Sequence, residues 1–124
     1  MEPPIIIIGA PRSGTSVLAR LLARHAELAY SNEPRLVWRF GNDGKSDMLS
    51  AADASDKVKR YIREHFKQFI KKEGKTRLLE KTPSNALRLA YVREVFPDCK
   101  VIHIIRNGYD SALSIRNYWN GHTS

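Results

Sequence analysis

Apolar residues occur in two patterns along the chain, as short continuous runs and as longer stretches with helical spacing. Short runs are typical of buried strands, whereas apolar residues three or four positions apart predict helices that bury one face. The runs predict strands at residues 5–8, 28–30, 77–80 and 101–105. The helical spacing predicts helices at residues 15–24, 56–72, 84–96 and 110–119, with a further short helix that Pro34 can open. This alternation indicates an α/β fold of three layers, in which helices flank a parallel β-sheet.

Finer details follow from the same pattern. In the first helix, Leu18, Leu21 and Leu22 are expected on one buried face, and Ser84 is expected to cap the helix at 84–96. Residues 41–54 are polar and contain glycine, which predicts a mobile loop. No repeat or linker divides the sequence, so residues 1–124 are expected to form a single domain.

Positive charge concentrates on the predicted helix at 56–72. The chain of 124 residues has a formal net charge of +8. The basic residues of this helix are Lys57, Lys59, Arg60, Arg63, Lys67, Lys71 and Lys72, and its apolar positions are Val58, Tyr61, Ile62, Phe66, Phe69 and Ile70. Because the apolar positions follow the helical period, the basic residues are interpreted as a solvated face. A surface that binds a polyanionic acceptor is the alternative, and no nucleic-acid partner is expected.

The remaining composition favours an intracellular protein without structural metal or disulfide. Cys99 is the single cysteine and is expected in the core, and His103 is expected to pack within the sheet. No histidine or cysteine has metal-ligand spacing. The apolar run at 5–8 is too short to span a membrane and follows no basic signal region, so the predicted location is the cytoplasm.

Residues 5–16 read Ile-Ile-Ile-Ile-Gly-Ala-Pro-Arg-Ser-Gly-Thr-Ser, an apolar strand that runs through a glycine-bearing loop into a helix. The first N–H groups of such a helix are unpaired and lie at the positive end of its dipole, which predicts an anion site in the loop. Thr15 stands where the nucleoside-triphosphate loop has its lysine. The cation is instead Arg12, whose planar guanidinium and hydroxyl neighbours suit a phosphosulfate better than a magnesium triphosphate. A strand–turn–helix junction that merely contains an arginine is the alternative.

A second anion site is predicted after the strand at 101–105. Arg106 follows this strand, Asn107-Gly108 forms a turn, and Asp110 is a natural N-cap for the next helix. Ser114 lies about one turn into that helix, so the guanidinium and the hydroxyl can converge on one phosphate. Both residues would lie at the carboxyl edge of a parallel sheet, where open α/β folds bind ligands. An ordinary turn with a surface arginine is the alternative.

Three segments together resemble the sulfotransferase family: residues 9–16, Glu80-Lys81-Thr82-Pro83 and residues 105–114. These enzymes use 3'-phosphoadenylyl sulfate as the sulfuryl donor, so the resemblance implies a P-loop-like fold that binds this nucleotide without a metal. It further implies that Arg106 and Ser114 bind the 3'-phosphate. The implied 5'-phosphosulfate loop consists of Pro11, Arg12, Ser13, Gly14, Thr15 and Ser16. Family members are usually longer, so the chain is expected to be an amino-terminal part without the carboxyl-terminal segment, and exposed apolar sheet surface would favour self-association.

Transfer of a sulfuryl group needs a base for the acceptor and a cation for the leaving phosphate. Glu33 is the candidate base, since Asn32-Glu33-Pro34-Arg35 resembles the acidic segment of tyrosylprotein sulfotransferases; a helix-capping carboxylate is the alternative. Arg12 is the candidate for the leaving phosphate. Lys81 is expected to bind the sulfonate or leaving-group oxygens, with a surface lysine as the alternative, and Glu80 is a candidate to orient Lys81 or Arg12.

The leading hypothesis is therefore a sulfotransferase that uses 3'-phosphoadenylyl sulfate and a hydroxyl or amine acceptor. The acceptor class stays open among carbohydrate, lipid, peptide and small molecule, with residues 41–54 expected on the recognition surface. A non-catalytic nucleotide- or polyanion-binding fragment is the main alternative. A P-loop phosphotransferase is weaker because the loop has no lysine.

Overall fold

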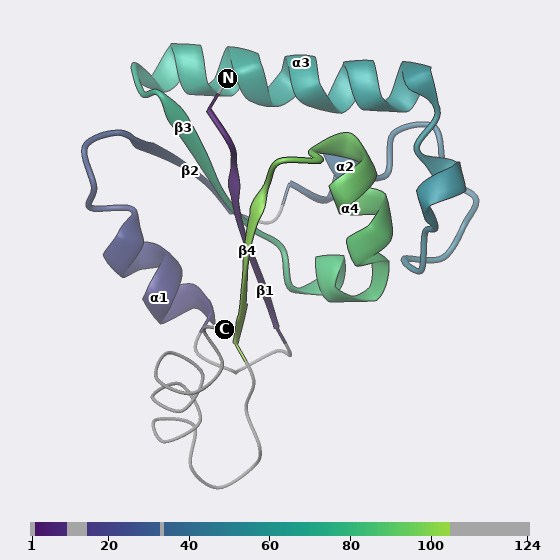
Figure 1. Cartoon of the computed structure of the whole chain (residues 1–124), viewed down its shortest axis with the longest axis horizontal. Helices are drawn as coiled ribbons and strands as arrows, with labels where there is room; N and C mark the ends of the chain where they lie inside the picture. Colours follow the sequence, from purple (N-terminus) through teal and green to yellow (C-terminus); the bar gives the residue numbers. More distant parts are fainter. Residues whose placement is uncertain (1, 10–14, 33, 105–124) are drawn as a thin grey trace, which may run out of the picture.

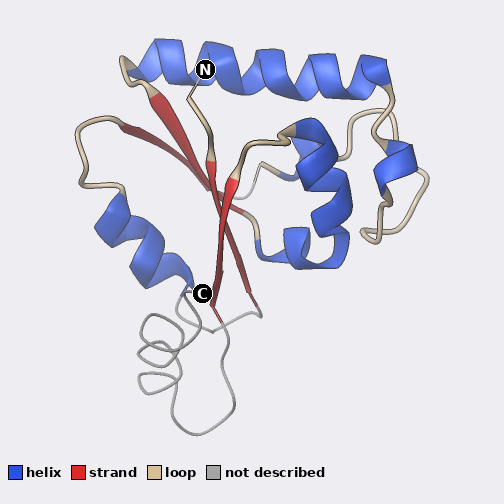
Figure 2. Ribbon diagram, viewed as in Figure 1, coloured by secondary structure: helices blue, strands red, loops and turns tan. Residues whose placement is uncertain are grey.

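The computed structural model describes residues 2–9, 15–32 and 34–104, which form one sheet with helices on both sides (Figure 1, Figure 2). The strands are β1 (Ile5–Gly9), β2 (Leu28–Asn32), β3 (Arg77–Lys81) and β4 (Lys100–Ile104). Neighbouring strands are all parallel and lie in the order β2-β3-β1-β4. The predicted α/β fold is confirmed, and the carboxyl ends of the four strands lie at one edge of the sheet.

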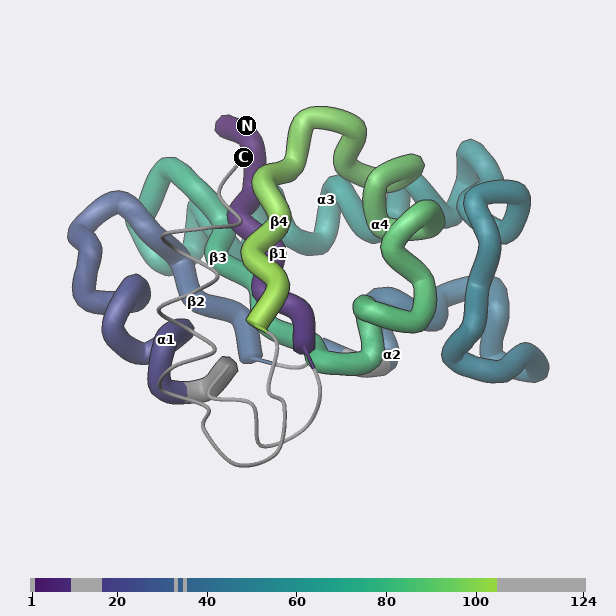
Figure 3. The backbone as a smooth tube through the Cα atoms, turned by 60° about the horizontal axis from the view of Figure 1, so that its bottom comes forward, coloured from purple at the N-terminus to yellow at the C-terminus, as the bar shows by residue number. Residues whose placement is uncertain are grey.

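The two faces of the sheet pack against different helices. One face packs on α1 (Thr15–Leu22), where Ile7, Ala19 and Leu79 are buried. The other face holds the larger core, to which α2 (Arg35–Trp38), α3 (Asp56–Glu73) and α4 (Leu89–Val95) contribute. Figure 3 shows α1 on the opposite side of the strands from α4. Because side chains alternate along a strand, the neighbours Leu78 and Leu79 belong to opposite cores.

The predicted basic helix is present as α3. Ser55 caps its start by accepting a hydrogen bond from the backbone N–H of Val58, and Gly74 ends it in the left-handed conformation at a φ of 68°. The buried positions are Val58, Ile62, Phe66 and Ile70. The basic side chains are exposed apart from the half-buried Lys59, so they lie on the surface of this helix as predicted. Tyr61 lies at the margin, where its ring stacks on Phe40 with 3.8 Å between centroids.

The start of the predicted 84–96 helix differs from the expectation. Pro83 opens a 3-10 helix, η2 (Pro83–Arg88), and the α-helix α4 begins only at Leu89. Thr82 is the residue before η2, so Ser84 lies inside this element and does not cap it. The fixed φ of proline favours the first helical position, which moves the start forward of Ser84.

Three other packing predictions have mixed outcomes. Leu21 is 54% exposed, and Ala19 takes its place against the sheet. Cys99 is buried in the core as predicted. His103 is exposed rather than packed within the sheet, because β4 is an edge strand among the described residues. The predicted helix at 110–119 lies outside the described residues.

The polar segment 41–54, predicted as a loop, contains a short 3-10 helix, η1 (Ala51–Asp53), and makes several side-chain contacts. Asn42 donates to the carbonyl of Asp53 at 3.3 Å, and Lys45 pairs with the Asp53 carboxylate at 2.5 Å.

Within the described ranges, no helix has the length and apolar character needed to cross a membrane.

Candidate functional site

The candidate site is the edge of the sheet at which all four strands end. β1 ends at Gly9 and α1 begins at Thr15, so the predicted phosphosulfate loop joins these two elements. β2 ends at Asn32 beside the predicted base, and β3 ends at Lys81. This arrangement follows from parallel pairing, which collects the loops that follow each strand at one edge.

Most of the predicted site residues lie outside the part of the chain that the structure describes. Arg12 and its loop neighbours Pro11, Ser13 and Gly14 lie outside the described residues, as do Glu33, Arg106 and Ser114. Thr15 and Ser16 form the start of α1, as predicted for a helix entered from the loop. Lys81 is therefore the predicted catalytic side chain whose surroundings the structure describes.

Lys81 is a buried residue of an inner strand. In the sheet register it lies between Ile7 of β1 and Asn32 of β2, and its side chain is 5% exposed. Its Nζ lies 3.4 Å from Oδ1 of Asn32. The alternative of a surface lysine is therefore wrong. Its position on β3 places the ammonium on the α1 side of the sheet, the side toward which the phosphosulfate loop leads.

Glu80 precedes Lys81 but belongs to the opposite face of the sheet. Its carboxylate is fully buried and accepts three hydrogen bonds. Trp38 donates through Nε1 at 2.8 Å, Asn85 donates through Nδ2 at 3.2 Å, and the Thr82 hydroxyl donates as well. The hypothesis that Glu80 orients Lys81 is wrong, because consecutive residues of a strand point to opposite faces.

Burial raises the pKa of Glu80 to about 7, from an ordinary value of 4.5. Loss of solvation is the largest cause, since it penalises the charged carboxylate. The hydrogen bonds from Thr82 and Trp38 and the positive charge of Arg88 oppose it by stabilising the charged form. The group therefore titrates close to neutral pH while it is enclosed in the core.

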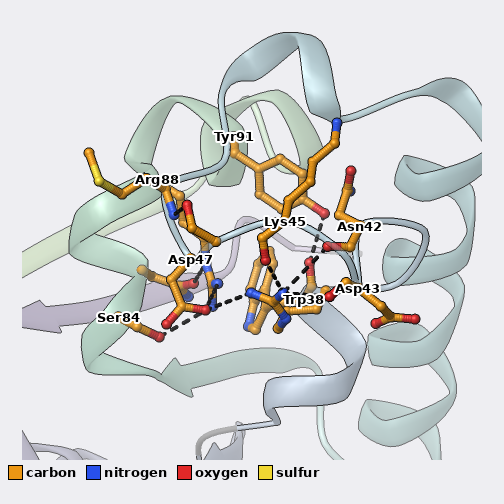
Figure 4. A network of polar contacts seen from close by, with 12 residues as sticks. Trp38, Asn42, Asp43, Lys45, Asp47, Ser84, Arg88 and Tyr91 are labelled. Carbon is orange, nitrogen blue, oxygen red and sulfur yellow. Dashed lines mark hydrogen bonds and ion pairs between the residues drawn. The ribbon is translucent and has the colours of Figure 1, made fainter.

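A polar network extends from Glu80 to the segment 41–47. Asn85 accepts a hydrogen bond from Nε of Arg88 at 2.8 Å, and Nη1 of Arg88 lies 3.5 Å from the Asp47 carboxylate (Figure 4). Asp47 also pairs with Arg39 at 2.7 Å. Arg39 donates in addition to backbone carbonyls of residues 42, 43 and 45. The network therefore joins the end of β3 to the segment predicted to recognise the acceptor.

Sequence reasoning missed this network, although one signal pointed to it. Glu80 follows Leu78 and Leu79 in an apolar strand, and a carboxylate inside a parallel sheet must find donors. The identity of those donors is a tertiary property, since Trp38 is 42 positions away from Glu80.

Among the described residues there is no group of three or more histidine, cysteine or acidic side chains that could hold a metal ion.

Comparison with known proteins agrees with this architecture. The model of a family described as "Sulfotransferase family" matches residues 3–124. The nodulation protein NoeE of Sinorhizobium fredii is 29% identical over 91% of this chain and 31% of its own length. Protein-tyrosine sulfotransferase 1 of Danio rerio is 30% identical over 91% of this chain and 35% of its own length. Protein-tyrosine sulfotransferase A of Caenorhabditis elegans is 26% identical over 92% of this chain and 33% of its own length.

The chain thus spans about a third of the length of these curated relatives. The family match covers nearly all of it, including the loop after β1, the end of β3 and the segment after β4. The chain belongs to the sulfotransferase family.

Proposed function

We propose that this chain is the donor-binding part of a sulfotransferase that moves a sulfuryl group from 3'-phosphoadenylyl sulfate to a hydroxyl or amine acceptor. The observation that carries the proposal is the common edge of the parallel sheet. There the Gly-Ala-Pro-Arg-Ser-Gly-Thr-Ser loop leads from β1 into α1, and Lys81 ends the strand next to β1.

The donor contacts are assigned from these positions and the family motifs. The loop 11–16 and the start of α1 bind the 5'-phosphosulfate, because unpaired N–H groups at a helix start attract anions. Arg106 and Ser114, after β4, bind the 3'-phosphate. This division would give the protein two separate phosphate sites and predicts a preference for a nucleotide with phosphates at both positions.

The transfer itself needs a base and positive charge at the same edge. In the reaction the bond between sulfur and the bridging phosphate oxygen breaks, and a bond between sulfur and the acceptor oxygen forms. Glu33 takes the proton of the acceptor hydroxyl. Arg12 and Lys81 stabilise the negative charge that develops on the leaving phosphate and the sulfonate oxygens.

The first acceptor to test is a tyrosine side chain of a peptide. Several relatives are named protein-tyrosine sulfotransferases, which supports a hydroxyl acceptor in a protein or peptide. We assign acceptor recognition to the segment that contains residues 41–47. The polar network connects this segment to Glu80, which precedes Lys81 on the same strand.

Calorimetric titration with adenosine 3',5'-bisphosphate tests the donor site, with 5'-AMP as the comparison ligand. We expect preference for the bisphosphate, and loss of that preference in Arg106→Ala. Arg93→Ala is the matched control, since it removes an exposed arginine of α4. A folded protein that binds many polyanions in a salt-sensitive way with no preference for the 3'-phosphate would contradict the proposal.

A further inference from the structure

The last two residues of β3 contact the last residue of β2 and the last residue of α2. On one face of the sheet, Lys81 lies 3.4 Å from the Oδ1 atom of Asn32, the last residue of β2. On the other face, Glu80 accepts a 2.8 Å hydrogen bond from Nε1 of Trp38, the last residue of α2. The end of β2 and the end of α2, which lie on either side of position 33 in the sequence, thus both contact one strand.

The attachment of α2 depends on Trp38. α2 has four residues, too few for a helix that is stable without tertiary contacts. Trp38 is fully buried, and its ring packs near Phe66 and Phe96 at centroid distances of 5.5 and 6.1 Å. Its backbone carbonyl also accepts a 2.7 Å hydrogen bond from the Tyr91 hydroxyl (Figure 4).

Packing alone allows an aromatic ring some freedom to rotate and slide, whereas the hydrogen bonds restrict it. The indole N–H has one favourable direction, and Glu80 lies in that direction. Glu80 is itself held by Thr82 and Asn85, which follow it on the same chain segment. The carboxylate therefore fixes α2 relative to the turn that leaves β3.

We propose that Glu80 is a positioning residue that fixes α2 against the strand that carries Lys81. This inference rests on the proposed function, in which Glu33, two positions before α2 in the sequence, is the acceptor base. A base must lie within hydrogen-bond reach of the proton that it takes, so small displacements of α2 lower the transfer rate. Donor binding should be insensitive to Glu80, because Glu80 faces away from the α1 side of the sheet.

Two variants test the proposal. Glu80→Gln keeps the shape of the side chain but replaces one acceptor oxygen with an NH2 group. If that NH2 group faces the NH2 group of Asn85, two donors meet. Asn85 cannot offer its oxygen instead, because that oxygen already accepts a hydrogen bond from Arg88. Trp38→Phe removes the indole donor and keeps an aromatic ring. Arg77→Met is the matched control, since it removes a hydrogen bond to the Pro3 carbonyl at the opposite end of the same strand.

The readouts are kcat for transfer from 3'-phosphoadenylyl sulfate to a tyrosine-containing peptide, Kd for adenosine 3',5'-bisphosphate, and amide hydrogen exchange. For Glu80→Gln and Trp38→Phe we expect kcat to fall at least about tenfold while Kd stays within about twofold. Exchange should become faster in peptides that cover residues 34–40 and remain unchanged in α3. The control should change none of these.

An unchanged kcat, or faster exchange throughout α3 as well as α2, would overturn the proposal in favour of a general role in stability. Failure of the proposed function gives a different result. In that case the wild-type protein binds no bisphosphate and transfers no sulfuryl group, and the exchange data alone decide whether Glu80 fixes α2.

Discussion

The buried carboxyl group of Glu80 makes stability depend on pH in a direction opposite to that of most acidic residues. The substitution Glu80→Gln removes the titrating group and leaves a side chain of nearly the same size. The difference in stability between the two proteins should therefore change most steeply with pH where Glu80 is ionised in the unfolded chain and protonated in the folded chain, and it should be fully developed above that range.

The magnitude follows from the two pKa values. Burial raises the pKa of Glu80 from 4.5 to about 7, so the folded state binds this proton more tightly than the unfolded state. Below pH 4.5 both states hold the proton and the stability from this group is fully present. As the pH rises from 4.5 to about 7, unfolding releases the proton and that stability is lost. At about 1.4 kcal/mol for each pH unit, the loss amounts to about 3 kcal/mol.

Urea denaturation of both proteins, followed by circular dichroism between about pH 4.5 and pH 8, measures this difference. Other titrating groups are common to the two proteins and cancel in the difference. We expect the free energy of unfolding of Glu80→Gln, relative to wild type, to increase by about 3 kcal/mol over that range. Glu73→Gln is the matched control, because Glu73 is exposed at the end of α3. Parallel curves for Glu80→Gln and wild type would refute the reasoning.

Three further predictions use the same protein. Thr82→Val removes a hydrogen bond to the Glu80 carboxylate, so the pKa of Glu80 should rise further and the variant should lose more stability at pH 8 than at pH 5 in the same denaturation series. Gly74→Ala should lower the free energy of unfolding by about 1 kcal/mol, because residue 74 has a φ of 68° and a methyl group there would meet no atom, which leaves only backbone strain. Lys81→Met should reduce sulfuryl transfer by about a hundredfold in steady-state kinetics, since it removes a cation from the developing charge.

Much of the sheet could be predicted from the sequence because its information is local. The apolar run Ile5–Gly9 and the helical spacing in α3 each report burial within a few neighbouring residues. The parallel arrangement followed from the alternation of the two patterns. The predicted carboxyl-edge site followed in turn, since parallel strands bring their following loops to one edge.

The parts that sequence reasoning missed depend on distant partners. The ion pair between Arg88 and Asp47 and the hydrogen bond between Trp38 and Glu80 join segments that are about 40 positions apart. Periodicity contains no information about such pairs. The start of η2 was misplaced for a different reason, because Ser84 and Pro83 both signal a helix start and the proline takes precedence.

The opposite orientations of Glu80 and Lys81 explain why a carboxyl group is buried at this edge. An apolar side chain at position 80 would remove the cost of desolvating a carboxylate, but it would leave the donors of Trp38, Thr82 and Asn85 without a partner. A carboxylate binds these three donors in one arrangement, whereas apolar contacts tolerate several. The hydrogen bonds of Glu80 lie on one face of β3 and the ammonium of Lys81 lies on the other, so the two adjacent side chains do not compete for space. We infer that Glu80 specifies the geometry of this edge and that its contribution to stability decreases as the pH rises toward 7.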